Sequence, residues 1–362
     1  MRKKKSSESA LHEVEGIKPP SSISDNSIKK IKQNRSEQPS ETLFVEKILA
    51  GDISYLSRAI TLIESTNPKH QAKATAIIEH CLPYANKSVR IGITGVPGVG
   101  KSTFIESLGK YLTARGNKIA VLAIDPSSRR TKGSILGDKT RMEDLANDPN
   151  AYIRPSSSAG TLGGVARNTR ESIILCEAAG FNIIFVETVG VGQSETAVHS
   201  MVDFFLLLML AGAGDELQGI KRGIMEMADA IVINKADGDN ISKAELAARE
   251  YKNALHLFPP SPSGWTPMVM TASSVEGKGI ETTWGMVDEY VKLTRGSGYF
   301  EVRRKEQSLQ AFTDTIEETI RQKFYHHASV SSHIQSIQQD ILAGKISPYA
   351  AAQELMKVYL AK

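Results

Sequence analysis

Residues 95–102, Gly-Val-Pro-Gly-Val-Gly-Lys-Ser, have the types and spacing of a phosphate-binding loop, G-x-x-x-x-G-K-S/T. Glycines in this pattern let backbone N–H groups turn toward phosphate oxygens, and the N-terminus of the following helix adds a positive dipole. Lys101 is expected to reach the β- and γ-phosphates, and the Ser102 hydroxyl to bind Mg²⁺. The loop therefore predicts a nucleoside triphosphate site. The residues expected at the phosphates are Gly95, Gly98, Val99, Gly100, Lys101, Ser102 and Thr103.

A second motif, Asn234-Lys235-Ala236-Asp237, indicates which base is bound, because it directly follows an expected strand at 230–233. A carboxylate at Asp237 can accept hydrogen bonds from guanine N1–H and N2–H₂, a pair of donors that adenine lacks. Lys235 can cover the base plane with its aliphatic stem, and Asn234 can either bond N7 or tie the loops together. In related GTPases a Ser-Ala pair offers backbone N–H groups to guanine O6, and here Ser273 and Ser274 occupy that place. We expect GTP or GDP as the ligand.

Two carboxylates are expected near the phosphates. Glu187 begins Glu-Thr-Val-Gly after an expected strand at 182–186, where Ras-like GTPases have Asp-x-x-Gly with a glycine, here Gly190, that senses the γ-phosphate. Asp125 follows an expected strand at 119–124. Because ligands collect at the carboxyl ends of parallel strands, both side chains are expected close to Mg²⁺.

The segments that must position these loops alternate between apolar strands and helices. The strands are apolar nearly throughout, as in central strands covered by helices on both faces. We therefore predict an α/β fold with a doubly wound, mostly parallel sheet. The apolar run 204–213 is about half the length of a membrane helix, so no membrane span is expected. The expected strands are 89–94, 119–124, 182–186, 204–210, 230–233 and 268–270.

Four segments are expected along the chain: a disordered basic tail at 1–40, a helical extension at 41–86, a P-loop GTPase domain at 87–297 and a helical arm at 298–362. The arm carries an apolar stripe at helical spacing, and Ser347-Pro348 is a helix-start signal within it. The stripe predicts packing either on the arm's own domain or on a second copy of the chain. The stripe residues are Leu309, Phe312, Ile316, Ile320 and Phe324.

Charge and cysteine content exclude several classes of function. The chain has 362 residues and a formal charge of +4, and residues 1–40 hold nine Lys/Arg against five Asp/Glu, so the remainder is formally neutral. A neutral body gives no overall attraction to nucleic acid. The two cysteines, Cys81 and Cys176, cannot form a disulfide framework or a Cys-based metal cage. A cytoplasmic location is expected.

Two longer motifs resemble those of the MeaB/ArgK family: residues 125–142, which include Asp-Pro-Ser-Ser and Gly-Ser-Ile-Leu-Gly-Asp-Lys-Thr-Arg-Met, and residues 187–195, Glu-Thr-Val-Gly-Val-Gly-Gln-Ser-Glu. Members of this family are P-loop GTPases that act as chaperones of cobalamin-dependent acyl-CoA mutases, chiefly methylmalonyl-CoA mutase. The resemblance runs from about Ile53 to the arm. It implies that the nucleotide state controls cobalamin loading.

The resemblance also implies residue roles. Asp125, Asp138 and Glu187 would gather around Mg²⁺, directly or through water, and residues 212–221 would form an extra switch loop that contacts the mutase and the nucleotide. It favours a homodimer formed through the arm. The catalytic set implied by motif and resemblance is Lys101, Glu187, Asp125 and Lys221.

A residue that orients the attacking water does not stand out. Gln193 is one candidate, and Lys221, Arg129 or Arg130 could act as a positive finger. An incomplete site can be completed in trans, so slow intrinsic turnover accelerated by a partner is expected.

Three alternatives remain open. The chain could be a metallochaperone GTPase for another metalloenzyme, although such sites need Cys or His ligands near the switches. It could be a kinase of periplasmic transport proteins, a description this family has carried, or a GTP-sensing adaptor with incidental hydrolysis. The acyl-CoA mutase partner could also be one that acts on another substrate, such as isobutyryl-CoA.

Overall fold

The structure is a computed structural model that describes residues 39–124, 142–155, 162–188, 194–212 and 221–360. Several residues singled out above lie outside this part of the chain: Asp125, Arg129, Arg130, Asp138, Gly190, Gln193 and the loop 213–220. Lys221 begins a described helix, but its side chain is not among those described.

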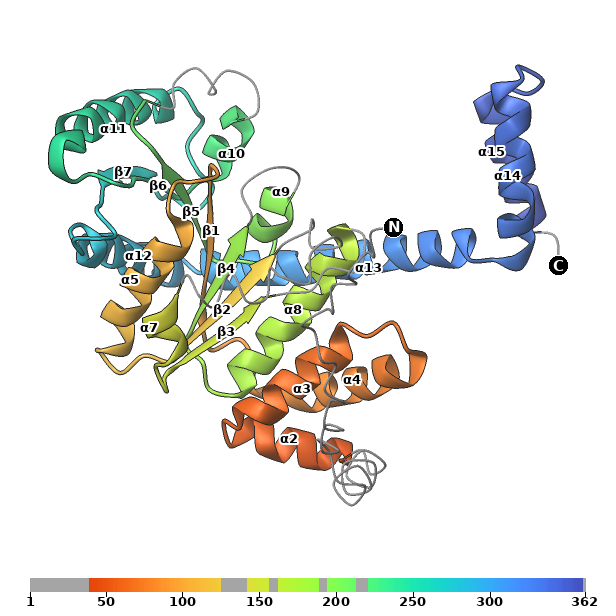
Figure 1. Cartoon of the computed structure of the whole chain (residues 1–362), viewed down its shortest axis with the longest axis horizontal. Helices are drawn as coiled ribbons and strands as arrows, with labels where there is room; N and C mark the ends of the chain where they lie inside the picture. The colour runs from red at the N-terminus through yellow and green to blue at the C-terminus, as the bar shows by residue number, and fades with distance from the viewer. Residues whose placement is uncertain (1–38, 125–141, 156–161, 189–193, 213–220, 361–362) are drawn as a thin grey trace, which may run out of the picture. The chain divides into compact units, whose positions relative to one another are not determined.

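Within the described residues, one sheet of seven parallel strands has the order β3-β2-β4-β1-β5-β6-β7 (Figure 1). The predicted doubly wound α/β fold is confirmed. The strands are β1 (Val89–Gly95), β2 (Ile119–Ile124), β3 (Ala151–Pro155), β4 (Ile183–Thr188), β5 (Phe204–Met209), β6 (Ala230–Ile233) and β7 (Met268–Thr271).

Strand β3 was not among the predicted strands. It spans five residues at the edge of the sheet, where it pairs with β2 alone, and it contains Arg154 and Pro155. Proline is tolerated at such an edge because no neighbouring strand needs its missing N–H. The resulting sequence lacks the apolar run by which the central strands were found.

Both faces of the sheet are buried, which explains the apolar strands. Ile91 and Ile93 of β1 point into the cluster around α5 (Lys101–Thr113) and α12 (Ile280–Gly296). Alternate residues of β2, such as Leu122, pack in the other cluster, which contains α8 (Leu162–Ala178). The remaining helices in the described part of the GTPase region are α7 (Glu143–Ala146), α9 (Ser194–His199), α10 (Lys221–Met227), α11 (Ile241–Leu255) and the short η4 (Gly238–Asn240).

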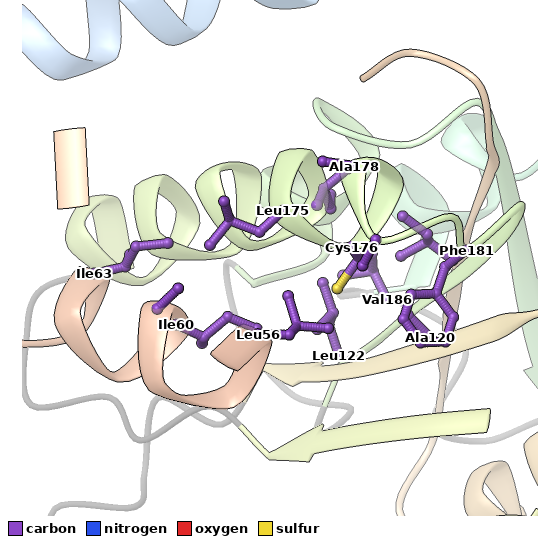
Figure 2. Packing of buried hydrophobic residues seen from close by; sticks show 14 of the residues in the cluster. Leu56, Ile60, Ile63, Ala120, Leu122, Leu175, Cys176, Ala178, Phe181 and Val186 are labelled. Carbon is purple, nitrogen blue, oxygen red and sulfur yellow. The ribbon is translucent and has the colours of Figure 1, made fainter. Parts of the chain in front are cut away.

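The predicted N-terminal helical region consists of α2 (Glu41–Leu49), α3 (Ile53–Ile63), α4 (Pro68–Cys81) and the short η1 (Leu82–Tyr84). The predicted apolar face of α3, formed by Leu56, Ile60 and Ile63, is buried. Figure 2 shows this face packed against α8, next to Leu175 and Cys176. Helix α8 is therefore covered by the sheet on one side and by the N-terminal helices on the other.

The C-terminal region is helical, with α13 (Tyr299–Tyr325), α14 (Ala328–Leu342) and α15 (Pro348–Leu360). The Ser347 hydroxyl accepts a hydrogen bond from the Ala350 N–H at 3.2 Å, which confirms the predicted helix start at Pro348. Among the described residues, no helix is both long and apolar enough to cross a membrane.

Candidate functional site

The phosphate-binding loop joins β1 to α5, as predicted. Gly95 adopts φ 153°, and a Cβ there would lie 2.3 Å from the carbonyl oxygen of Leu208 on β5. Gly100 adopts φ 90°, and a Cβ there would lie 3.0 Å from Nδ2 of Asn234. Glycine is thus required at both ends of the loop, by backbone conformation and by the close approach of neighbouring chain segments. Gly98 and Thr103 are exposed, and Val99 is buried.

Lys101, at the start of α5, is buried at the mouth of this loop. Its Nζ donates hydrogen bonds to the carbonyl oxygens of Gly95 at 2.9 Å and Val96 at 3.4 Å. Burial lowers the pKa of Lys101, and the negative charges of Glu187 and Glu195 act in the opposite direction. A phosphate placed beside Nζ would supply the negative charge that favours the protonated lysine.

Ser102 and Glu187 come together although they are far apart in the sequence. Parallel pairing of β1 with β4 places Ile93 opposite Glu187, and the Ser102 hydroxyl donates to Oε1 of Glu187 at 3.4 Å. A hydroxyl and a carboxylate are oxygen ligands of the kind that Mg²⁺ prefers. The described residues contain no cluster of three or more His, Cys, Asp or Glu side chains able to hold a metal, and Asp125 and Asp138 lie outside them.

Asn234 connects the guanine motif to the phosphate loop. Its Nδ2 donates to the carbonyl oxygen of Val99 at 2.8 Å. Its Oδ1 accepts from the Ser274 backbone N–H at 3.3 Å and from the Ser274 hydroxyl at 2.8 Å. Of the two roles considered for Asn234, the structure shows the one that ties the loops together. Alanine at position 274 would lack the hydroxyl contribution.

Asp237 and Ser273 also lie together. The Ser273 hydroxyl donates to Oδ2 of Asp237 at 2.6 Å, which orients the carboxylate. Lys235, between Asn234 and Asp237, is exposed and adopts φ 60°, in the left-handed region that non-glycine residues seldom occupy. The five predicted guanine-site residues therefore occupy two adjacent loops, after β6 and after β7.

Sequence reasoning did not assign a role to Glu195. Its side chain is 2% exposed at the start of α9, and its charge acts on Lys101. Burial raises the pKa of Glu195. The signal available in the sequence was its place at the end of the motif 187–195. Its burial, which is unusual for a carboxylate, is seen only in the structure.

The two cysteines lie away from this site. Cys81 and Cys176 are both buried in the apolar cluster that contains residues of the N-terminal helices, α8 and the sheet. Figure 2 shows Cys176 in this cluster. Burial raises the pKa of the Cys81 thiol to about 11 and raises that of Cys176 as well. Neither is suited to bind a metal near the switch segments, because metal ligation requires the thiolate.

Comparison with known proteins identifies the family. Residues 56–329 match the family described as "Methylmalonyl Co-A mutase-associated GTPase MeaB". This chain belongs to the MeaB family. The match covers more than half of the chain and includes the phosphate loop, the guanine motif and the whole of α13.

Relatives in several organisms support the same assignment. A probable GTPase of Mycobacterium tuberculosis is 49% identical over 311 residues, which cover 86% of this chain and 93% of that protein. GTPase ArgK of Escherichia coli is 42% identical, covering 86% and 94% respectively. A mouse protein named methylmalonic aciduria type A homolog, mitochondrial, is 43% identical, covering 88% and 80%.

A solved structure of an LAO/AO transport system kinase is 35% identical to this MeaB-family chain, with a TM-score of 0.71, and covers 88% of this chain and 97% of that one. Fold, site geometry and relatives agree. This MeaB-family protein is a P-loop GTPase that hydrolyses GTP.

Proposed function

We propose that this MeaB-family GTPase is a cytoplasmic chaperone of a cobalamin-dependent acyl-CoA mutase, and that its nucleotide state gates cobalamin loading and protects or reactivates the mutase. Methylmalonyl-CoA mutase is the favoured partner. The observation that carries this proposal is the match of residues 56–329 to a family described as methylmalonyl-CoA mutase-associated. The matched region includes the nucleotide site and the whole of α13, so the family resemblance covers the part of the chain that carries the GTP site.

For hydrolysis, we assign charge neutralisation to Lys101, whose Nζ now bonds the loop carbonyls and would turn to the β- and γ-phosphate oxygens. Ser102 and Glu187 would hold Mg²⁺, with Asp125 and Asp138 as further predicted ligands. When bound, Mg²⁺ would neutralise charge on the β- and γ-phosphates. Asp237, oriented by Ser273, would select guanine. Lys221 would act at the γ-phosphate when a partner orders it there.

The partner can be tested by measuring GTP turnover of the full chain with and without purified methylmalonyl-CoA mutase, together with cobalamin transfer followed by absorbance. We expect the mutase to raise the GTPase rate, and cobalamin loading to differ between GTP and a non-hydrolysable analogue. Lys221→Ala should lose most of the acceleration and keep the intrinsic rate, because Lys221 would act only when the partner orders it.

A GTP-sensing adaptor would use the same site residues, and this experiment separates it from a chaperone. An adaptor would bind the mutase in a nucleotide-dependent way without any effect of hydrolysis on cobalamin loading. An unchanged GTPase rate and unchanged loading with every acyl-CoA mutase of the same organism would reject the chaperone proposal and leave the GTPase assignment intact.

The arm is the proposed homodimer contact. Three apolar side chains on one face of α13 are exposed within the chain: Leu309 by 69%, Phe312 by 66% and Ile320 by 58%. Phe324, further along the stripe, packs on Tyr359 of α15. A second copy covering the exposed part would remove a continuous apolar strip from water.

The dimer contact predicts that Leu309→Asp combined with Phe312→Asp gives a monomer, because two carboxylates would be buried in an apolar interface. Light scattering after size-exclusion chromatography measures the mass. Arg321→Asp is a suitable control, because Arg321 is exposed on the same helix and lies off the stripe. A native protein that is monomeric at micromolar concentration, or a double variant that stays dimeric, would contradict this contact.

A further inference from the structure

Helix α9 is a short element held tightly against the sheet. It follows the segment 187–193 and spans six residues, about 9 Å from end to end. Val198 packs on β1 at Gly92, where an added Cβ would lie 2.8 Å from Val198 Cγ1. Because the helix packs so closely on β1, we expect it to move as a rigid unit, so that a displacement of one end also displaces the other.

The first turn of α9 lies close enough to the phosphate loop for the charge of Glu195 to act on Lys101. Ser194 and Glu195 are both buried. The charge of Glu195 acts on Lys101 together with that of Glu187, and Lys101 in turn acts on Glu195. The position of this turn therefore affects the electrostatic surroundings of the lysine that is expected to meet the phosphates.

The last residue of α9 contacts the arm. Nη2 of Arg303, on α13, donates to Nε2 of His199 at 3.1 Å. Burial and the neighbouring guanidinium lower the pKa of His199 to about 4, so its ring is neutral at neutral pH and Nε2 can accept this hydrogen bond. The His199 ring also packs edge-on against Phe205 of β5, which limits its rotation.

Arg303 is itself held by three further groups. Its Nη1 donates to the Asp203 carbonyl oxygen at 3.1 Å and to the Tyr290 hydroxyl at 3.0 Å, and it lies 3.9 Å from a carboxylate oxygen of Asp229. Because these contacts fix the guanidinium, a movement of α13 would move His199 with it.

A second bridge joins the same end of α9 to the arm. Arg170 of α8 donates from Nη2 to the Ser200 hydroxyl at 2.7 Å, and its Nη1 pairs with Asp314 of α13 at 3.1 Å. Ser200 directly follows His199, so two arginines connect this point of the chain to positions 303 and 314 of α13.

We propose that His199 and Arg303 are positioning residues of the GTPase site. Because they hold α9 to α13, the position of α13 determines where Glu195 lies relative to Lys101. A shift of α13 relative to the sheet would then change the rate of GTP hydrolysis through α9. The proposal rests on the GTPase activity and does not depend on which mutase is the partner.

The arm offers a matched control for this contact. Arg304, next to Arg303, donates from Nε and Nη2 to the Asp203 carboxylate at 2.8 and 2.7 Å, and from Nη2 to the Ser88 carbonyl oxygen at 2.7 Å. Arg304 thus anchors α13 to the amino edge of the sheet through residues outside α9. If Arg303 served only to anchor the arm, substitution of Arg303 and of Arg304 would have the same effect on kcat.

The experiment compares His199→Leu, His199→Gln, Arg303→Lys and Arg304→Lys in the full chain, with steady-state kcat and KM for GTP and the thermal midpoint of each. Loss of the bond in His199→Leu should lower kcat about five- to tenfold, within the range that coupling through packed contacts produces, while KM changes less than about twofold. Glutamine, whose amide oxygen can accept from Arg303, should restore most of kcat. Arg303→Lys should lower kcat, and Arg304→Lys should lower the thermal midpoint with kcat unchanged.

Two results would overturn the proposal. One is a wild-type kcat in folded His199→Leu. The other is a kcat that simply follows the thermal midpoint across all four variants, because that would mean the contact serves stability alone. Should His199→Leu fail to fold, the comparison of Arg303→Lys with Arg304→Lys decides the question by itself.

A double variant tests the route through Glu195. If His199 acts by placing Glu195, then Glu195→Gln combined with His199→Leu should lower kcat no further than the stronger single change. Independent effects whose fold-changes multiply would show that the arm contact reaches the site by some other path and would reject this one.

Discussion

Lys101→Ala is expected to lower GTP turnover by about 10²- to 10³-fold while the fold persists, since it removes the cation placed to stabilise charge on the transferred phosphoryl group. The side chain bonds only loop carbonyl oxygens among its described hydrogen-bond partners. Its removal therefore leaves the apolar contacts of α5 in place. Phosphate release measured under single-turnover conditions gives the rate, and circular dichroism checks the fold.

Lys110→Ala is the matched control for this experiment. Lys110 lies on the same helix, is exposed and pairs with Asp144, so the same residue change is made away from the phosphate loop. It should keep the native rate. A folded Lys101→Ala variant that releases phosphate as fast as the native protein would rule out the proposed site.

Asp237→Asn is expected to weaken GTP binding by about 10- to 100-fold, the loss associated with a bidentate hydrogen-bond pair, and to favour xanthosine triphosphate. The amide would present a donor where guanine also has donors, whereas the C2 carbonyl of xanthine can accept from it. Ser273 can still donate to the side-chain oxygen of asparagine, as it does to Oδ2 of Asp237. Titration with GTP, ATP and xanthosine triphosphate measures the preference.

Asp239→Asn makes the same change two residues further on, at an exposed position in η4, and should leave the preference for GTP intact. Equal affinity of the native protein for ATP and GTP would reject the guanine assignment. So would a folded Asp237→Asn variant with the nucleotide preference of the native protein.

The nucleotide motif could be predicted because its geometry is local. A strand, a glycine-containing turn and a helix start suffice to form a phosphate loop, and all three lie within residues 89–113. The guanine motif was recognisable for the same reason, since Asn234 directly follows a buried strand. Central strands were found because burial on both faces demands apolar side chains at every position. Strand β3 was not predicted because it lies at the edge of the sheet and contains Arg154 and Pro155.

The direction in which the apolar stripe of the arm faces could not be predicted from the sequence and is seen only in the tertiary structure. Helical spacing showed that Leu309, Phe312 and Ile320 share a face, but not what covers it. In the folded chain that face is exposed, and the opposite side of α13 pairs with the rest of the protein, for example through Asp314 and Arg170. Hydrophobic periodicity identifies the residues of an apolar face but does not show what that face packs against.

By itself, then, the sequence determined the chemistry: a triphosphate loop, a guanine reader and an α/β sheet to carry them. Only the tertiary structure decided which distant residues meet: Asn234 with Val99, Ser102 with Glu187, and His199 with Arg303. These pairs are 135, 85 and 104 residues apart along the chain. The strand order β3-β2-β4-β1-β5-β6-β7 brings them together. The physical reason is that such contacts depend on how strands and helices pack in space, which the spacing of residues within one element does not encode.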